Sequence, residues 1–162
     1  MSITIRTGLE PGDLGYITYM HGRIYHDEYG FDSTFEPYVA RPMSEFSLAG
    51  DQSRQQIWVV EMDGKIVGCI AIVDAGGNEA QLRWLLLTKE TRGKGLGERL
   101  MSEAVDFCRE KGYNNVFLWT IDALHAARGL YLKHRFKVTE EKKHVMWGVE
   151  VNEQRYDLKL KG

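Results

Sequence analysis

The sequence predicts a mixed α/β fold, in which helices lie on the faces of a mixed sheet. Apolar residues alternate along some segments and recur every three to four residues along others, which marks strands and helices respectively. The dipeptide Asp63-Gly64 joins two β-rich runs and favours a tight hairpin. No linker or internal repeat divides the 162 residues, so residues 1–162 are expected to form one domain. The expected order is β-α-α-β-β-β-α-β-α-β-β.

The first half of the chain is predicted to hold one strand, two helices and the hairpin. Alternation marks the short first strand, and Pro11 with Asp13 suits the first turn of the following helix. The elements expected here are residues 3–6, 11–29, 35–48, 56–62 and 65–74.

The second half continues the sheet and adds two helices. A third strand follows the turn at Gly76-Gly77-Asn78, which gives consecutive antiparallel strands. Leu96, Leu100 and Ala104 then recur at helical spacing, and Gly112 suits the end of that helix. The elements expected here are residues 80–88, 98–111, 116–121, 124–133, 136–147 and 150–160.

Composition restricts the classes of function. The net charge of -2 provides no general basic field, which argues against a nucleic-acid platform and makes any attraction to an anion local. Cys69 and Cys108 lie in apolar patterns, as free cysteines do in a reducing cytoplasm. We found no leader pattern and no apolar run near the ~20 residues of a bilayer span, so we expect a soluble cytoplasmic protein. The five histidines are scattered, and no metal site is expected.

The run Arg92-Gly93-Lys94-Gly95-Leu96-Gly97 lies between the third strand of the meander and the helix after it. Glycines let the backbone approach a bulky anion, and a helix N-terminus offers unpaired N–H groups. Glu98-Arg99 follows where a Walker A loop needs Lys-Ser or Lys-Thr, and Leu100 is too large for the dinucleotide fingerprint. A Gly-rich turn before a helix is also common in proteins where it binds no ligand, so the loop taken alone leaves a purely structural role open.

A second motif narrows the range of roles that the glycine loop could have. Residues 127–131, Ala-Arg-Gly-Leu-Tyr, lie one strand and one loop beyond the glycine helix. Phe136 follows the tyrosine of this motif by five residues. Together the two motifs resemble the GCN5-related N-acetyltransferase (GNAT) superfamily over nearly the whole chain. The resemblance implies a GNAT-like fold and an N-acetyltransferase, an acyltransferase that moves the acetyl group of acetyl-CoA to a primary amine by direct attack in a ternary complex.

The resemblance also implies a site. A bulge in the strand before the loop would leave the backbone N–H of Leu85 free to polarise the thioester carbonyl and would leave Leu87 free to pair with pantetheine. Tyr131 would protonate the departing thiolate, because a phenol with pKa ~10 keeps its proton at neutral pH. The cofactor-binding residues implied are Leu85, Leu87, Arg92, Gly93, Lys94, Gly95, Leu96, Gly97, Glu98, Leu124 and Tyr131.

Three positions depart from the family pattern. Gln81 stands where many members carry the glutamate that acts as general base, so a water relay to another carboxylate or a neutral amine is needed; Glu28 is the catalytic candidate, with Asp27 and Glu79 as alternatives. Leu124 replaces an asparagine that contacts the cofactor arm, a contact that is then missing or supplied by His125. Arg135 replaces a glycine, from which we expect a somewhat different turn.

The sequence does not identify the molecule that would accept the acetyl group. Aromatic and acidic residues are dense over residues 16–32 and suit a cationic amine, although an ordinary amphipathic helix accounts for them as well. Residues 25–32, with Phe35 and Tyr38, resemble the acetyltransferase half of MarR-type regulator fusions; these residues contain no DNA-binding half. A peptide or small-molecule amine is the expected partner, with a monomer or homodimer. A non-catalytic acyl-CoA sensor and a nucleotide-phosphate binder are the alternatives.

Overall fold

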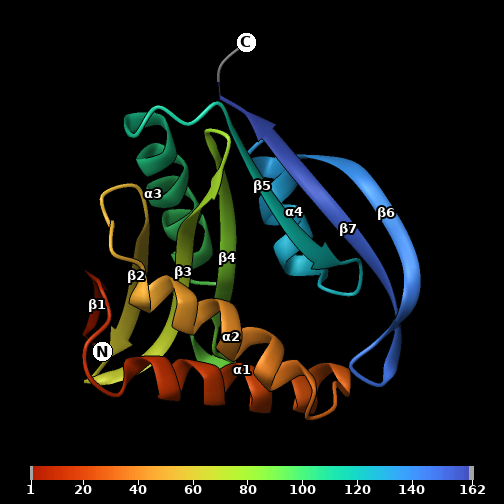
Figure 1. Ribbon diagram of the computed structural model, residues 1–162. Helices are drawn as coiled ribbons and strands as arrows, with labels where there is room; N and C mark the ends of the chain where they lie inside the picture. Colours follow the sequence, from red (N-terminus) through yellow and green to blue (C-terminus); the bar gives the residue numbers. More distant parts are fainter. Residues whose placement is uncertain (1, 161–162) are drawn as a thin grey trace.

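A seven-stranded sheet in the order β1-β2-β3-β4-β5-β7-β6 runs through the computed structural model, which describes residues 2–160 (Figure 1). The predicted fold class and element order are confirmed, with boundaries shifted by about two residues at most and a 3-10 turn at Lys89–Thr91 that was not predicted. The remaining elements are β1 (Ile3–Thr7), α1 (Asp13–Tyr29), α2 (Phe35–Leu48), β2 (Gln56–Met62), β3 (Lys65–Gly76), β4 (Glu79–Leu87), α3 (Leu96–Glu110), β5 (Asn115–Ile121), α4 (His125–Lys133), β6 (Lys137–Met146) and β7 (Val149–Lys159).

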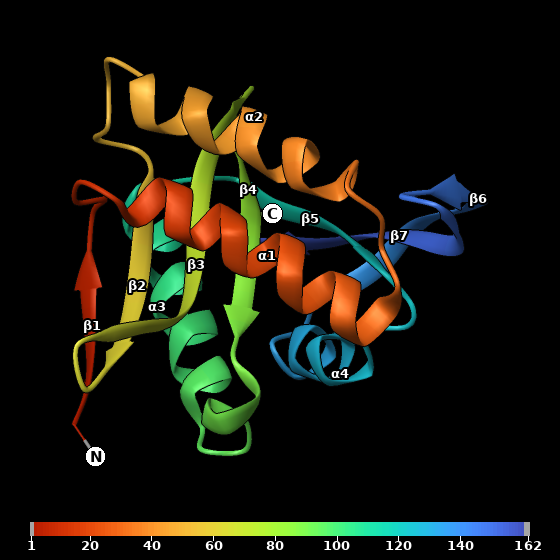
Figure 2. The same ribbon diagram turned by 90° about the horizontal axis from the view of Figure 1, so that it is seen from below.

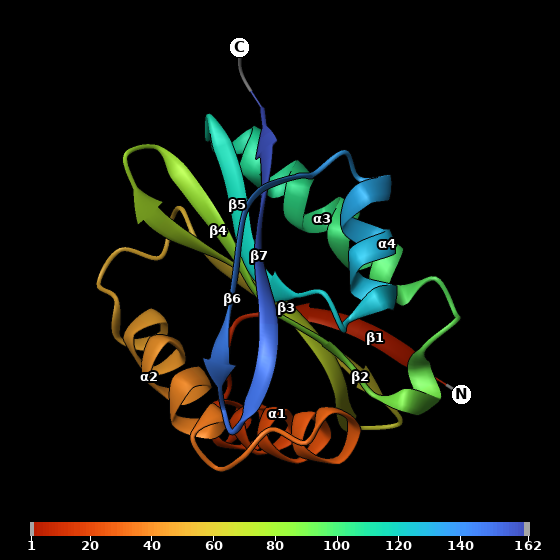
Figure 3. The same ribbon diagram turned by 90° about the vertical axis from the view of Figure 1, so that its right-hand side faces the viewer.

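Helices cover both faces of the sheet. α1 and α2 lie side by side across strands β2 to β4 on one face (Figure 2), and α3 and α4 lie on the other (Figure 3). Each pair of helices buries its apolar stripe against its own face, so the sheet separates two hydrophobic cores. Ile17 and Met43 are fully buried in the first core, and Leu100 and Ala104 in the second.

β4 is the strand at which the sheet opens. Its pairing with β3 shifts register between Cys69 and Ala71, which places Trp84 and Leu85 in a bulge. Trp84 has a φ of 56°, and the Cys69 thiol donates a hydrogen bond to the Trp84 carbonyl at 3.1 Å. On its other side β4 pairs with β5 in parallel over residues 79–81 alone, after which the two strands diverge (Figure 1). Among the described residues, no strand therefore pairs with the second half of β4 on the β5 side.

The end of α4 corrects one expectation. Arg135 has a φ of 71°, so the left-handed turn is kept without a glycine, and the prediction of a different turn is wrong. The Phe136 N–H donates to the Tyr131 carbonyl and the Arg135 N–H to the Leu132 carbonyl, both at 3.0 Å, which is the Schellman pattern. These two bonds and the burial of Phe136 offset a left-handed cost of ~1–2 kcal/mol.

Within residues 2–160, no helix combines the length and the apolar character needed to cross a membrane.

Candidate functional site

Two cavities meet at the bulge of β4. One, of about 320 Å³, extends towards the glycine loop, and the other, of about 120 Å³, extends between α1, α2 and the diverging strands. Three residues line both cavities, Tyr25 of α1, Leu85 of β4 and Leu124 before α4. A molecule in each cavity would therefore meet the other at the Leu85 backbone.

The larger cavity, called here the donor groove, ends at the N-terminus of α3. Gly93 and Gly95 line it in left-handed conformations, with φ of 76° and 79°. Gly95 caps α3 and no side chain bonds to the first N–H groups of that helix, so they remain available to an anion. The net charge of -2 gives the chain no general attraction for anions, so the positive end of the α3 dipole provides a local one.

Gly97 lies where the glycine loop packs closely against α4 and β4. A Cβ at this position would lie 3.2 Å from Cδ2 of Leu130 on α4 and 3.7 Å from Cδ1 of Leu87 on β4. The absence of a side chain lets the loop backbone approach both β4 and α4. Most of the cofactor-binding residues expected from the sequence line this groove, namely Leu85, Leu87, Arg92, Gly93, Gly95, Leu96, Gly97, Glu98 and Leu124.

Three expected donor-side residues lie elsewhere, and one of them, Tyr131, lines only the smaller cavity. Lys94 is exposed and lines neither cavity, and the same holds for His125, the substitute considered for the missing asparagine. Leu124 itself lies at the junction of the cavities, where it offers an apolar contact. Glu98 is on the groove wall, with its carboxylate 3.3 Å from Lys133 Nζ.

Arg92 and Glu28 form an ion pair that joins the glycine loop to α1. Arg92 Nη1 and Nη2 donate to the two carboxylate oxygens of Glu28 at 2.8 and 3.0 Å, and Nε donates to the Leu87 carbonyl at 3.0 Å. The hydrogen bond to Glu28 raises the pKa of Arg92. Glu28 lines neither cavity, and both its oxygens are engaged. Glu28, the carboxylate expected to be catalytic, is therefore placed in an ion pair outside both cavities.

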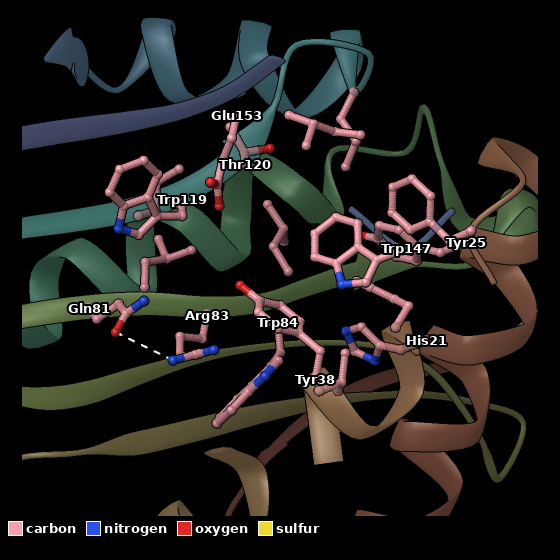
Figure 4. Close-up of a pocket in the computed structure, with 18 of the residues that line it drawn as sticks. His21, Tyr25, Tyr38, Gln81, Arg83, Trp84, Trp119, Thr120, Trp147 and Glu153 are labelled. Atoms are coloured by element: carbon pink, nitrogen blue, oxygen red, sulfur yellow. Dashed lines mark hydrogen bonds between the residues drawn. The ribbon is translucent and has the colours of Figure 1, made fainter. Parts of the chain in front are cut away.

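Aromatic residues are the largest group in the walls of the smaller cavity, called here the acceptor pocket. Its polar groups come from His21 on α1, Gln81 and Arg83 on β4, Thr120 on β5 and Glu153 on β7 (Figure 4). The aromatic residues that line it are Tyr25, Phe31, Phe35, Tyr38, Trp84, Trp119, Tyr131 and Trp147. Such walls suit a small acceptor with a positive charge.

Tyr131 of α4 lines the acceptor pocket and not the donor groove. Its ring packs against Tyr156 and Phe136, with centroids 5.5 and 6.1 Å apart, and its side chain is 5% exposed. Burial raises the pKa of Tyr131, and the nearby Tyr156 adds to the rise. Burial also raises the pKa of Tyr25, with Tyr131 contributing. Both phenols therefore stay protonated at neutral pH and can donate.

Glu153 is a carboxylate of the pocket that sequence reasoning missed. It is 8% exposed, and Figure 4 shows its side chain pointing from β7 into the pocket near Thr120. Its Oε1 lies 3.0 Å from His144 Nε2 and 3.7 Å from Lys142 Nζ, whereas Oε2 has no partner among the described residues. Glu153 belongs to an alternating strand without a motif, so only its register opposite Ile121 of β5 reveals its place.

His21 is a second pocket residue without a sequence signal. It is 3% exposed, and its Nδ1 donates to the Ile17 carbonyl at 2.8 Å, which leaves Nε2 as an acceptor. Burial lowers the pKa of His21 to about 4, and the bond to Ile17 opposes this shift. The imidazole is therefore neutral at physiological pH.

This neutral histidine predicts an acid-sensitive fold. Below pH ~6.5 the unfolded chain binds a proton at His21 that the folded chain excludes down to about pH 4. We therefore expect the free energy of unfolding to fall by ~1.4 kcal/mol per pH unit across this window, and by roughly 3 kcal/mol in total. Urea titrations of wild type and His21→Gln from pH 7 to 4.5 measure it. The stability difference between the two proteins is expected to narrow with acid, and a difference that stays the same at every pH would contradict the prediction.

Comparison with known proteins identifies relatives of the chain. The acetyltransferase (GNAT) family model matches residues 22–136. An uncharacterised N-acetyltransferase of Schizosaccharomyces pombe is 31% identical over 124 residues, which are 74% of this chain and 74% of that protein. The probable N-acetyltransferase camello of Xenopus tropicalis is 29% identical over 116 residues, 67% of this chain. The chain spans about half of camello, 53% of its length.

Solved structures share the fold. An N-acetyltransferase from Staphylococcus aureus Mu50 superposes with a TM-score of 0.79 at 17% identity, over 99% of this chain and 100% of that one. The yncA protein of Salmonella typhimurium, solved with its cofactor acetyl-CoA, superposes with a TM-score of 0.77 at 19% identity, over 98% of this chain and 94% of that one. At these identities the likeness concerns the fold alone.

Proposed function

The chain belongs to the acetyltransferase (GNAT) family, and we propose that it transfers the acetyl group of acetyl-CoA to a primary amine within a ternary complex. The observation that carries this proposal is the meeting of two cavities at Leu85, one ending in an anion cradle and the other walled by aromatic rings. A donor and an acceptor bound in this way react without a covalent enzyme intermediate. In this proposal residues 1–162 act as a single domain.

The donor groove fits acetyl-CoA as a substrate. The free N–H groups at the start of α3 suit the pyrophosphate, and the unpaired edge of β4 suits the amide groups of the pantetheine arm. Arg92 lies in the groove wall, where its charge faces the same anion although Glu28 shares it. The bulge sets the Leu85 N–H apart from the ladder with β3, where it can polarise the thioester carbonyl.

The amine nitrogen attacks the carbonyl carbon of the thioester, a C–N bond forms, and the C–S bond breaks. Leu85 stabilises the transient oxyanion, and Tyr131 protonates the thiolate, whose conjugate acid has a pKa of ~8.5. The proton of the amine leaves to Glu153, directly or through a water molecule. Gln81 lines the pocket at the position of the family glutamate, and its amide cannot take this proton.

Glu153→Gln tests the carboxylate. The amide keeps the size of the side chain and loses the negative charge, so we expect kcat/KM for the amine to fall about 100-fold at neutral pH, within the range for general base catalysis. The pH profile of kcat/KM, recorded for wild type and variant, measures this loss. Glu150→Gln on the same strand is exposed and lines neither cavity, which makes it the matched control. Equal profiles for the two variants would remove Glu153 from the mechanism.

Free thiol release from acetyl-CoA across a panel of amines tests the function itself. We expect release that depends on the amine. Tight binding of acetyl-CoA without release by any amine would favour a sensor of acyl-CoA. Equal affinity for ATP and desulfo-CoA would favour a binder of nucleotide phosphates.

A further inference from the structure

Arg83 brings a positive charge into the acceptor pocket without a carboxylate to balance it. Its guanidinium has no ion pair within 4.0 Å among residues 2–160, and Nη1 makes a single long hydrogen bond, 3.5 Å, to Gln81 Oε1. The guanidinium also lies 5.4 Å from the centre of the Trp84 ring. Most of the hydrogen-bonding capacity of Arg83 is therefore unused.

Burial makes this arrangement costly unless a ligand completes it. Burial lowers the pKa of Arg83, and Glu45 and Tyr38 oppose that shift only through longer-range attraction. A planar guanidinium presents several donors that match the two oxygens of a carboxylate. An unpaired arginine in a pocket wall therefore indicates an anionic group on the ligand.

Glu153 provides the opposite charge across the same pocket. It reaches the pocket from β7, while Arg83 reaches it from β4, and Figure 4 shows the two side chains on opposite walls. They form no ion pair with each other, and Glu153 Oε2 is free among the described residues. A ligand with both an ammonium and a carboxylate group would satisfy the two together.

We propose that the acceptor is a small amino acid, whose carboxylate binds Arg83 and whose amino group lies against Glu153. This inference rests on the proposed function and specifies the substrate class of the same site. The volume of the pocket, about 120 Å³, is well below the ~300–1,000 Å³ of sites for drug-sized ligands, which suits a molecule of this size. The aromatic walls between the two charges accept the apolar part of the amino acid.

The experiment compares matched acceptors by thiol release from acetyl-CoA. Phenylalanine, leucine and 4-aminobutyrate are each measured beside their carboxamide and their decarboxylated amine. We expect kcat/KM for at least one free acid to exceed that of its amide by about 10- to 100-fold, the range for a hydrogen bond to a charged group. Arg83→Gln is expected to abolish this preference for the acid, and Arg83→Lys to restore part of it.

The ratio of kcat/KM for the free acid to kcat/KM for its amide distinguishes a loss of carboxylate binding from a loss of folded protein. A structural role for Arg83 would lower both rates together, and that result would overturn the proposal, as would amides or simple amines that react as well as the acids. The wild-type ratio decides the matter even if Arg83→Gln does not fold. Arg41→Gln on α2 removes an exposed charge outside both cavities and serves as the control. If no acceptor of any kind releases thiol, the proposed function fails and this inference fails with it.

Discussion

Tyr131→Phe is expected to lower kcat by about 100- to 1,000-fold, which is the loss typical of a missing general acid. In the proposed mechanism the Tyr131 hydroxyl protonates the thiolate as the C–S bond breaks, and phenylalanine has no hydroxyl that could donate this proton. The variant keeps the ring that packs against Tyr156 and Phe136, and no described hydrogen bond involves the Tyr131 hydroxyl, so the fold is retained. Steady-state thiol release measures kcat, and calorimetry measures binding of acetyl-CoA, which we expect to change by less than about threefold because the donor groove is untouched.

Tyr156→Phe is the matched control. It removes a buried phenol hydroxyl from the same aromatic cluster, one that donates to Gln154 Oε1 at 3.1 Å, but Tyr156 lines neither cavity. This control is expected to lose stability, by about 1 kcal/mol, and to keep kcat. Full activity of Tyr131→Phe, or equal losses in the two variants, would show that Tyr131 is not the acid.

Gly97→Asp is expected to weaken the binding of acetyl-CoA by about 100-fold or more. Gly97 lines the groove at the start of α3, where a new carboxylate would lie beside the pyrophosphate in the proposed complex. Two like charges ~4 Å apart repel by ~4 kcal/mol at an effective dielectric constant of 20. The added Cβ also meets Leu130 at 3.2 Å and presses on the far wall of the groove. Calorimetric titration with acetyl-CoA measures the change.

Gly129→Asp places the same substitution within α4. Gly129 is exposed, has no atom within 4 Å of a Cβ, and lines neither cavity. We expect this control to bind acetyl-CoA with nearly unchanged affinity. The difference between the two variants is expected to shrink with added salt, because the Gly97→Asp penalty is electrostatic. Unchanged affinity in Gly97→Asp would mean that the pyrophosphate does not lie at this loop.

The fold was accessible from the sequence because its signals are local. The hairpin at Asp63-Gly64 depends on two adjacent residues, and the strands and helices depend on periods of two and 3.6 residues. The left-handed turn at Arg135 was not predicted correctly, because the Schellman bonds and the burial of Phe136 offset the cost of a left-handed arginine. The cytoplasmic location and the oligomeric state remain predictions.

The donor side of the site was accessible for the same reason. The glycine loop is one continuous segment, and its spacing specifies a cradle and the helix behind it. Leu85 and Leu87 could be placed because they precede that loop on the same strand. Glu28 could not be judged, because its partner Arg92 is 64 residues away along the chain.

The sequence by itself determined the family, the order of the elements and the position of the glycine loop before α3, since each is encoded in residues close together along the chain. Only the tertiary structure decided the acceptor pocket. Arg83, Glu153 and His21 come from three distant segments that meet where β4 and β5 diverge. Alternation along a strand tells which residues share a face, but not which strand lies beside it or where the ladder ends. Packing between distant elements sets both, and with them the charges that the acceptor meets.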